Sequence, residues 1–99
     1  MSRVEVAGVE VSTEHLIGGE RVSSDETFVD LSPLDAEPIA EVARGGAHEA
    51  ELAVAAATEA FPAWAALGAE GRAAHLHRLA DLIDASVERL AAVECADMA

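Results

Sequence analysis

The sequence predicts an α/β fold in which short strands, one pair of them a hairpin, precede two helices, and it predicts that this fold is incomplete. Before Gly45 the apolar residues alternate or form short runs between turn residues, which is typical of strands. After Gly46 they recur at steps of three and four, which is typical of amphipathic helices. The third observation is a shortage of bulky side chains to cover those helices.

That shortage follows from the composition. A chain of 99 residues fits one domain at most. Hydrophobic residues make up 52% of it, but 23 are alanine, against two Phe, one Trp and no Tyr. Alanine buries little apolar surface, and the single cysteine cannot form an internal disulfide. We therefore expect a thin core with no covalent cross-link.

The charge balance excludes several partners. Six arginines face 19 acidic residues, for a net charge of −13, so we expect no nucleic acid and no anionic membrane as partner. The longest apolar run, 52–57, is far shorter than the ~18 residues of a membrane span, and the N-terminus does not resemble a signal peptide. These features predict a cytoplasmic protein.

The first strands differ in the clarity of their signals. Valines spaced by twos in residues 1–14, with a slip at Ala7-Gly8, predict a tail or a single edge strand. Residues 15–22 predict a hairpin, because Gly18-Gly19 can supply the two positive φ angles of a tight turn. Further along, 27–31 and 39–42 read as strands on either side of a turn begun by Pro33 and Asp35, giving about four strands in all.

The first helix is predicted after Gly46, which can serve as its N-cap. Glu49 lies in its first turn, where the helix dipole favours a negative charge. Pro62 should interrupt or end it near Phe61. Its apolar stripe comprises Val54, Ala57, Phe61 and Trp64, and this spacing places Phe61 and Trp64 in a core.

A second helix is predicted from about Ala69. Its stripe comprises Leu76, Ala80, Ile83, Val87 and Leu90, widened by Leu79, Leu82 and Val93. Residues 94–99 contain no Gly, Asn or Pro to end it and no basic residue in a last turn. Because the stripe is still running there, we expect the chain to be an N-terminal piece of a longer protein.

Several segments, in this order and spacing, resemble the N-terminal region of the NAD(P)-dependent aldehyde dehydrogenase superfamily. They are His15-Leu16-Ile17-Gly18-Gly19-Glu20-Arg21-Val22, Ser32-Pro33-Leu34-Asp35 through Ala43, Ala53-Val54-Ala55-Ala56-Ala57 with Ala60-Phe61-Pro62-Ala63-Trp64, Gly71-Arg72-Ala73-Ala74, and Leu79-Ala80-Asp81-Leu82-Ile83. The resemblance implies that residues 15–99 form part of a cofactor-binding domain and that 1–14 precede it.

The resemblance also implies a reaction. Family members oxidise an aldehyde to a carboxylic acid with a cysteine nucleophile, a glutamate that activates water, and NAD or NADP. All of these residues, and the glycine-rich cofactor turn, come later in the family chain, so this segment is expected to contain no catalytic or cofactor-binding residue. Alone it should be inactive and bind no cofactor. Its expected partners are the remainder of the dehydrogenase chain and, at full length, further copies of the same subunit.

One departure and one likeness refine the comparison. Where many members open the first helix with Asp, this chain has Glu49, a longer acid that caps a helix less well. The run Glu94-Cys95-Ala96-Asp97 is similar to hydroxymuconic semialdehyde dehydrogenases, which act in aromatic degradation. The resemblance therefore extends to a semialdehyde substrate.

Metal binding has one weak candidate. Asp97 and the backbone carbonyl of Leu31 match positions that help some members bind a structural alkali cation, although two ligands do not make a site. A zinc site is not expected. His75 and His77 point about 200° apart on a helix and cannot chelate one ion, and His15 is expected to be an exposed strand residue.

Cys95 is not expected to act as a nucleophile. It lies near a helix C-terminus between Glu94 and Asp97, and both features disfavour the thiolate. It is expected instead to be a small, half-buried side chain.

Two alternatives to a dehydrogenase segment remain. The first is an independent acidic module that binds another protein through the stripe of Leu76, Ile83 and Leu90. The second is a truncated remnant without function.

Overall fold

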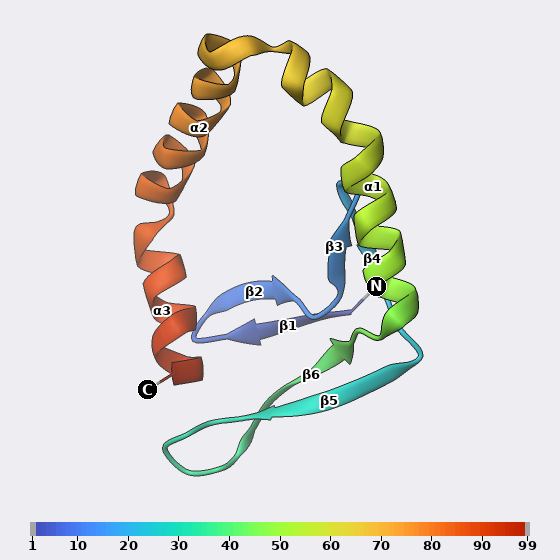
Figure 1. Cartoon of the computed structure of the whole chain (residues 1–99). Coiled ribbons are helices and arrows are strands. Elements are labelled where there is room, and N and C mark those ends of the chain that lie inside the picture. The colour runs from blue at the N-terminus through green and yellow to red at the C-terminus, as the bar shows by residue number, and fades with distance from the viewer. Residues whose placement is uncertain (1, 99) are drawn as a thin grey trace.

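The computed structural model describes residues 2–98 and contains six strands and three helices in that range (Figure 1). The strands are β1 (Arg3–Val6), β2 (Val9–Ser12), β3 (His15–Ile17), β4 (Glu20–Val22), β5 (Glu26–Leu31) and β6 (Pro38–Arg44). The helices are α1 (Ala47–Ala66), α2 (Gly68–Ala85) and α3 (Val87–Met98). Consecutive strands pair as three separate antiparallel hairpins.

The first hairpin corrects the prediction of a single edge strand in residues 1–14. Ala7 and Gly8 have φ angles of 50° and 80°, so they form a tight turn that reverses the chain. The two halves of the valine pattern then pair, with Val4 opposite Val11. The slip in the alternation was the turn itself, and the strand count rises from about four to six.

The other two hairpins confirm the predictions. Gly18 and Gly19 have φ angles of 60° and 80°, and β3 pairs with β4 across them. β5 pairs with β6 across the predicted turn, in which the Asp35 carboxylate accepts a hydrogen bond from the Glu37 N–H. The Ala43 N–H donates to the Thr13 carbonyl at 2.9 Å, which ties the end of the first hairpin to β6.

Helix α1 begins as predicted but ends later. Gly46 is the N-cap, and its N–H donates to the Glu49 carboxylate at 2.8 Å, so Glu49 helps to cap the helix from inside the first turn. The helix continues past Pro62, because the φ angle that proline imposes is itself helical. It ends where Gly68 takes a φ of 71°, a left-handed conformation common just after a helix.

The single second helix predicted from Ala69 is in fact two helices. Ser86, with φ −114° and ψ 10°, leaves the helical region between α2 and α3. Its N–H donates to the Ile83 carbonyl, and its own carbonyl accepts from the Leu90 N–H, the first bond of α3. Serine favours such helix boundaries, and an apolar stripe that runs through the break conceals it in the sequence.

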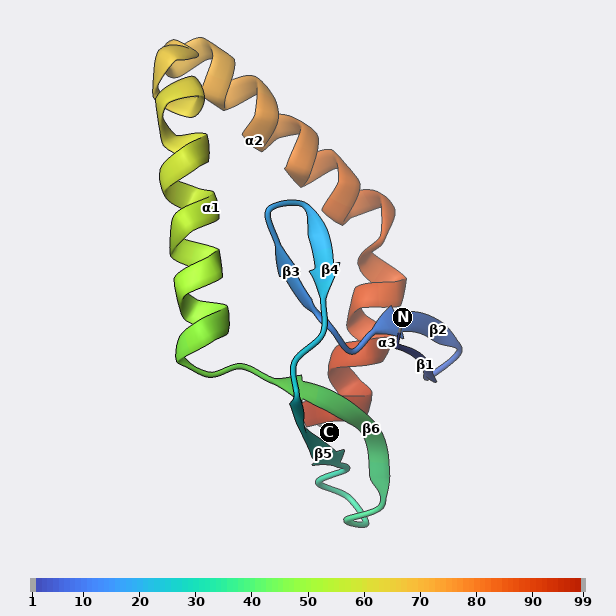
Figure 2. The same ribbon diagram turned by 90° about the vertical axis from the view of Figure 1, so that its right-hand side faces the viewer.

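The helices and strands enclose only a small core. The helices form two arms that meet at the α1–α2 junction, with β3–β4 between them (Figures 1 and 2). Helix α1 contacts β3, and α3 contacts β1 and β2. The radius of gyration is 16.4 Å, against about 12.6 Å for a compact domain of this length. Among residues 2–98, Val6 is the one hydrophobic residue that is buried. The thin core expected from the composition is confirmed.

A helix that spans a membrane must reach a minimum length and a minimum apolarity. Within residues 2–98 no single helix meets both; α1 and α2 meet them only when taken together, and this pair is bent by 117°.

Candidate functional site

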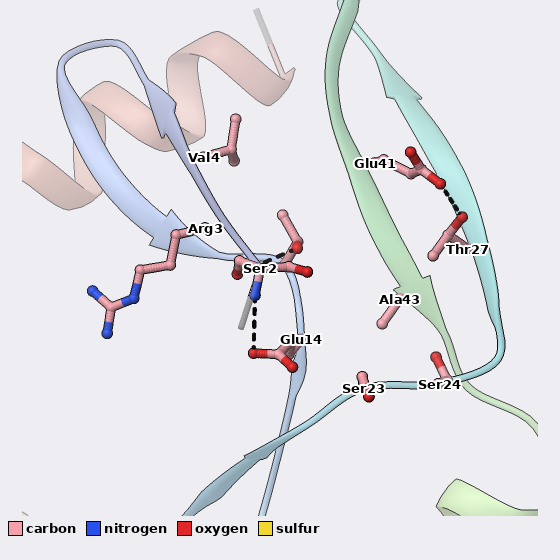
Figure 3. Close-up of a pocket in the computed structure, with 10 residues that line it drawn as sticks. Ser2, Arg3, Val4, Glu14, Ser23, Ser24, Thr27, Glu41 and Ala43 are labelled. Atoms are coloured by element: carbon pink, nitrogen blue, oxygen red, sulfur yellow. Dashed lines mark hydrogen bonds between the residues drawn. The ribbon is translucent and has the colours of Figure 1, made fainter.

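A polar cavity of about 490 Å³ lies between β1, the β5–β6 hairpin and the segments that join these hairpins to β3–β4 (Figure 3). Its lining is rich in hydroxyl groups and includes two carboxylates, Glu14 and Glu41. Glu14 accepts a hydrogen bond from the Ser2 N–H, and Glu41 accepts one from the Thr27 hydroxyl. Arg3 lines the cavity, but its side chain points away from it to pair with Glu10 at 2.6 Å. The lining contains hydroxyl groups and carboxylates but no cysteine or histidine, so it is suited to binding a polar group by hydrogen bonds.

A second, more apolar cavity of about 630 Å³ lies between β1–β2, β6 and α3. Three carboxylates line it, from Asp30, Glu94 and Asp97. A hydrogen bond to the Asp97 side chain raises the pKa of Asp30 above its usual 3.8, and desolvation and the charge of Asp97 add to this. The two carboxyl groups therefore lie close together.

This arrangement bears on the predicted cation ligands, Leu31 and Asp97. The structure brings Asp97 against Asp30, the residue that precedes Leu31 in β5. Within residues 2–98, no three His, Cys, Asp or Glu residues are grouped in a way that could hold a metal ion. The cation site remains a prediction. Sequence reasoning missed Asp30, although its position beside Leu31 was a signal that could have identified it.

The histidines do not gather at one place. His15 was expected to be exposed but is half-buried: its ring lies within hydrogen-bond distance of the Ser24 hydroxyl, with Nε2 to Oγ at 3.3 Å. Ser24 donates its own proton to the Glu26 carbonyl, so His15 Nε2 is assigned as the donor. His75 instead lies beside Trp64, with ring centroids 5.6 Å apart.

Two predictions of burial are wrong. The Cys95 side chain is exposed rather than half-buried. Trp64 and Phe61 remain 40% and 65% exposed, so the stripe of α1 does not enter a core in this chain. The physical reason is the same in each case, because no other element within residues 2–98 is placed to cover these helix faces.

The comparisons with known proteins agree on one family. A model described as "Aldehyde dehydrogenase family" matches residues 21–99. The chain is 46% identical over 83 residues to the 5-carboxymethyl-2-hydroxymuconate semialdehyde dehydrogenase of Escherichia coli, covering 84% of this chain and 18% of that protein. It is 38% identical over 84 residues to the 2-aminomuconic semialdehyde dehydrogenase of Mus musculus, covering 85% and 17%.

A third relative is the vanillin dehydrogenase of a Pseudomonas species, 51% identical over 71 residues, which cover 70% of this chain and 15% of that protein. The chain thus spans less than a fifth of the length of these relatives. No solved structure matches it significantly.

Proposed function

Because the chain belongs to the aldehyde dehydrogenase family, we propose that it forms the N-terminal part of an enzyme that oxidises an aldehyde to a carboxylic acid with NAD or NADP. The observation that carries the proposal is the family match over residues 21–99, which includes all three helices and β5–β6. When bound, the cofactor accepts the hydride released by the aldehyde carbon.

The residues of this chain alone do not fit the cofactor. A dinucleotide pyrophosphate binds at a helix N-terminus whose N–H groups are free. At the N-terminus of α1 the Glu49 carboxylate already accepts the Gly46 N–H, and a second anion there would be repelled. Gly18-Gly19 form a hairpin turn and are not followed by a helix. We therefore assign cofactor binding to other parts of the enzyme and a supporting role to this segment.

The relatives support a substrate class. The names of two of them state that they are dehydrogenases of muconic semialdehydes. We extend this to the present chain and propose a semialdehyde formed by aromatic ring cleavage, oxidised in the cytoplasm by a homo-oligomer. In that intact enzyme, Asp97 and the Leu31 carbonyl would be two of the ligands of a structural cation.

A chimeric enzyme tests the family role. The segment of the Escherichia coli relative that matches this chain is replaced by the chain itself, and oxidation of that enzyme's own semialdehyde is followed by NADH absorbance. The chimera should be active. A control chimera carries the corresponding segment of the Mus musculus relative and shows whether the junction is tolerated. An active control beside an inactive chimera of this chain would refute the proposal.

The exposed stripe of α2 favours one alternative, an acidic module that binds another protein. Under this alternative the isolated chain would melt cooperatively as a monomer, and it would not replace the segment of a dehydrogenase.

A further inference from the structure

A row of exposed apolar side chains runs along α2 and α3. None of the residues of these two helices is buried. The large side chains of the stripe are between 47% and 59% exposed: Leu76, Leu79, Leu82, Ile83, Val87 and Leu90. By contrast, α1 carries mainly alanine between its few large residues. The α2–α3 stripe therefore offers six large apolar side chains for a partner to bury.

Two grooves adjoin this stripe. One, of about 320 Å³, lies between β2 and the α2–α3 junction and is lined by Ile83 and Leu82 among others. The other is the apolar cavity beside α3 described above. Both grooves share the side chains of Val11, Leu90 and Val93. They therefore form one surface that follows α3 on both sides of its contact with the first hairpin.

The exposed area indicates the size of the missing partner. The chain exposes 7518 Å², whereas a compact protein of its mass exposes about 5,300 Å². The difference of about 2,200 Å² exceeds the ~800 Å² that each partner buries in a standard stable interface. The relatives supply a candidate partner, because more than four-fifths of their length lies outside the matched segment.

A second copy of this chain is a poorer occupant. Each copy has a net charge of −13, so two copies repel one another. No basic residue lines the cavity beside α3 to offset its three carboxylates.

From these observations we infer that the α2–α3 surface can hold the remainder of a dehydrogenase chain non-covalently, so that the two pieces assemble as separate chains. The inference rests on the proposed function. The inference goes beyond the proposed function because it does not require the two pieces to be one covalent chain. The area that they bury against each other is sufficient for a stable interface.

The experiment co-expresses the 99-residue chain with the Escherichia coli relative that lacks its matched segment. The two pieces should be recovered as one soluble complex that oxidises the semialdehyde. The truncated relative expressed alone should be insoluble or inactive. If adding the chain changes neither its solubility nor its activity, the inference is overturned. An active covalent chimera beside this result would leave the proposed function standing, so the two failures are distinguishable.

Two variants test the surface. Ile83→Glu charges the stripe within the first groove and should lower the recovered complex by about tenfold or more. Leu34→Glu makes the same kind of change at a loop residue that is 80% exposed and lines neither groove, and it should leave recovery unchanged. Equal recovery with Ile83→Glu and Leu34→Glu would overturn the assignment of the surface. The assignment would also be overturned if the chain alone formed a homodimer and Ile83→Glu dissociated it.

Discussion

Asp97 in α3 lies against Asp30 in β5, and this contact raises the pKa of Asp30. The contact joins α3 to β5, although more than fifty residues separate these two elements in the sequence. Both side chains line the same cavity, whose lining is mainly apolar.

This pair predicts a specific pH dependence. Since the folded chain holds a proton on Asp30 above the usual pKa of 3.8, it binds more protons than the unfolded chain, and its stability should fall as pH rises through the raised pKa. In Asp97→Asn the amide donates to Asp30, so the pKa of Asp30 should fall. NMR titration of the Asp30 carboxyl carbon measures this pKa in the unchanged chain and in Asp97→Asn. An unchanged Asp30 titration in Asp97→Asn would contradict the pairing, and Asp25→Asn is the control.

The isolated chain should oxidise no aldehyde and bind NAD or NADP weakly or not at all. The physical reason is that its one thiol is not paired with a base and the α1 N-terminus is filled by Glu49. Purified chain is assayed with aldehydes and cofactor, and cofactor binding is titrated by calorimetry. Turnover that disappears in Cys95→Ser would show that this thiol is the nucleophile after all.

The isolated chain should also be poorly packed. Each Leu or Ile of the α2–α3 stripe is about half exposed and so forgoes about half of the ~1.5 to 3 kcal/mol that full burial contributes, against a total stability of about 5 to 15 kcal/mol for a whole domain. Circular dichroism should show helix, while dye binding is strong and proton NMR lines are broad. Ile83→Glu should reduce aggregation and change little else. A sharp cooperative melt of the monomer would contradict this prediction and favour the independent module.

Gly68→Ala should weaken the α1–α2 junction by about 1 kcal/mol, because alanine is strained at positive φ. No atom lies within 4 Å of a Cβ built at this position, so the φ of 71° is the whole cost. Gly68→Asn should restore most of the loss, because asparagine tolerates this conformation. Amide hydrogen exchange in the last turn of α1 measures both. Equal exchange in Gly68→Ala and the unchanged chain would disprove the role of Gly68.

The Trp64–His75 contact provides a probe of the same junction. The two rings join α1 to α2 across the bend, so His75→Ala should shift Trp64 fluorescence toward that of a more exposed indole. His77→Ala, two residues away on the other side of α2, is the matched control. Identical spectra for His75→Ala and His77→Ala would show that the contact does not persist in solution.

The sequence was informative wherever local chemistry alone decides the structure. Gly18-Gly19 specified a hairpin because few residues accept two positive φ angles, and Gly46 with Glu49 specified a helix start. It failed where two signals compete. The valine alternation obscured the turn at Ala7, and the apolar stripe obscured the break at Ser86. Pro62 was expected to interrupt or end the first helix, which in fact continues to Ala66.

The candidate site was less predictable for a different reason. The meeting of Asp30 with Asp97 depends on how α3 packs beside the strands, which no local pattern encodes. The family resemblance pointed to Asp97 and to Leu31, the neighbour of Asp30, as cation ligands, and that role remains a prediction. The exposure of Cys95 and Trp64 likewise depends on which elements are placed to cover them.

The contact of β1 and β2 with α3 has a consequence during synthesis. The ribosome produces the first hairpin about 80 residues before α3, which at about 5 to 20 residues per second is a delay of about 4 to 16 seconds. A hairpin forms within microseconds, so the outer edges of β1 and β2 are exposed to water and unpaired during this delay. Arg3 of β1 and Glu10 of β2, which form an ion pair across this hairpin, place charged side chains on it during that interval. They would discourage pairing between nascent chains on neighbouring ribosomes.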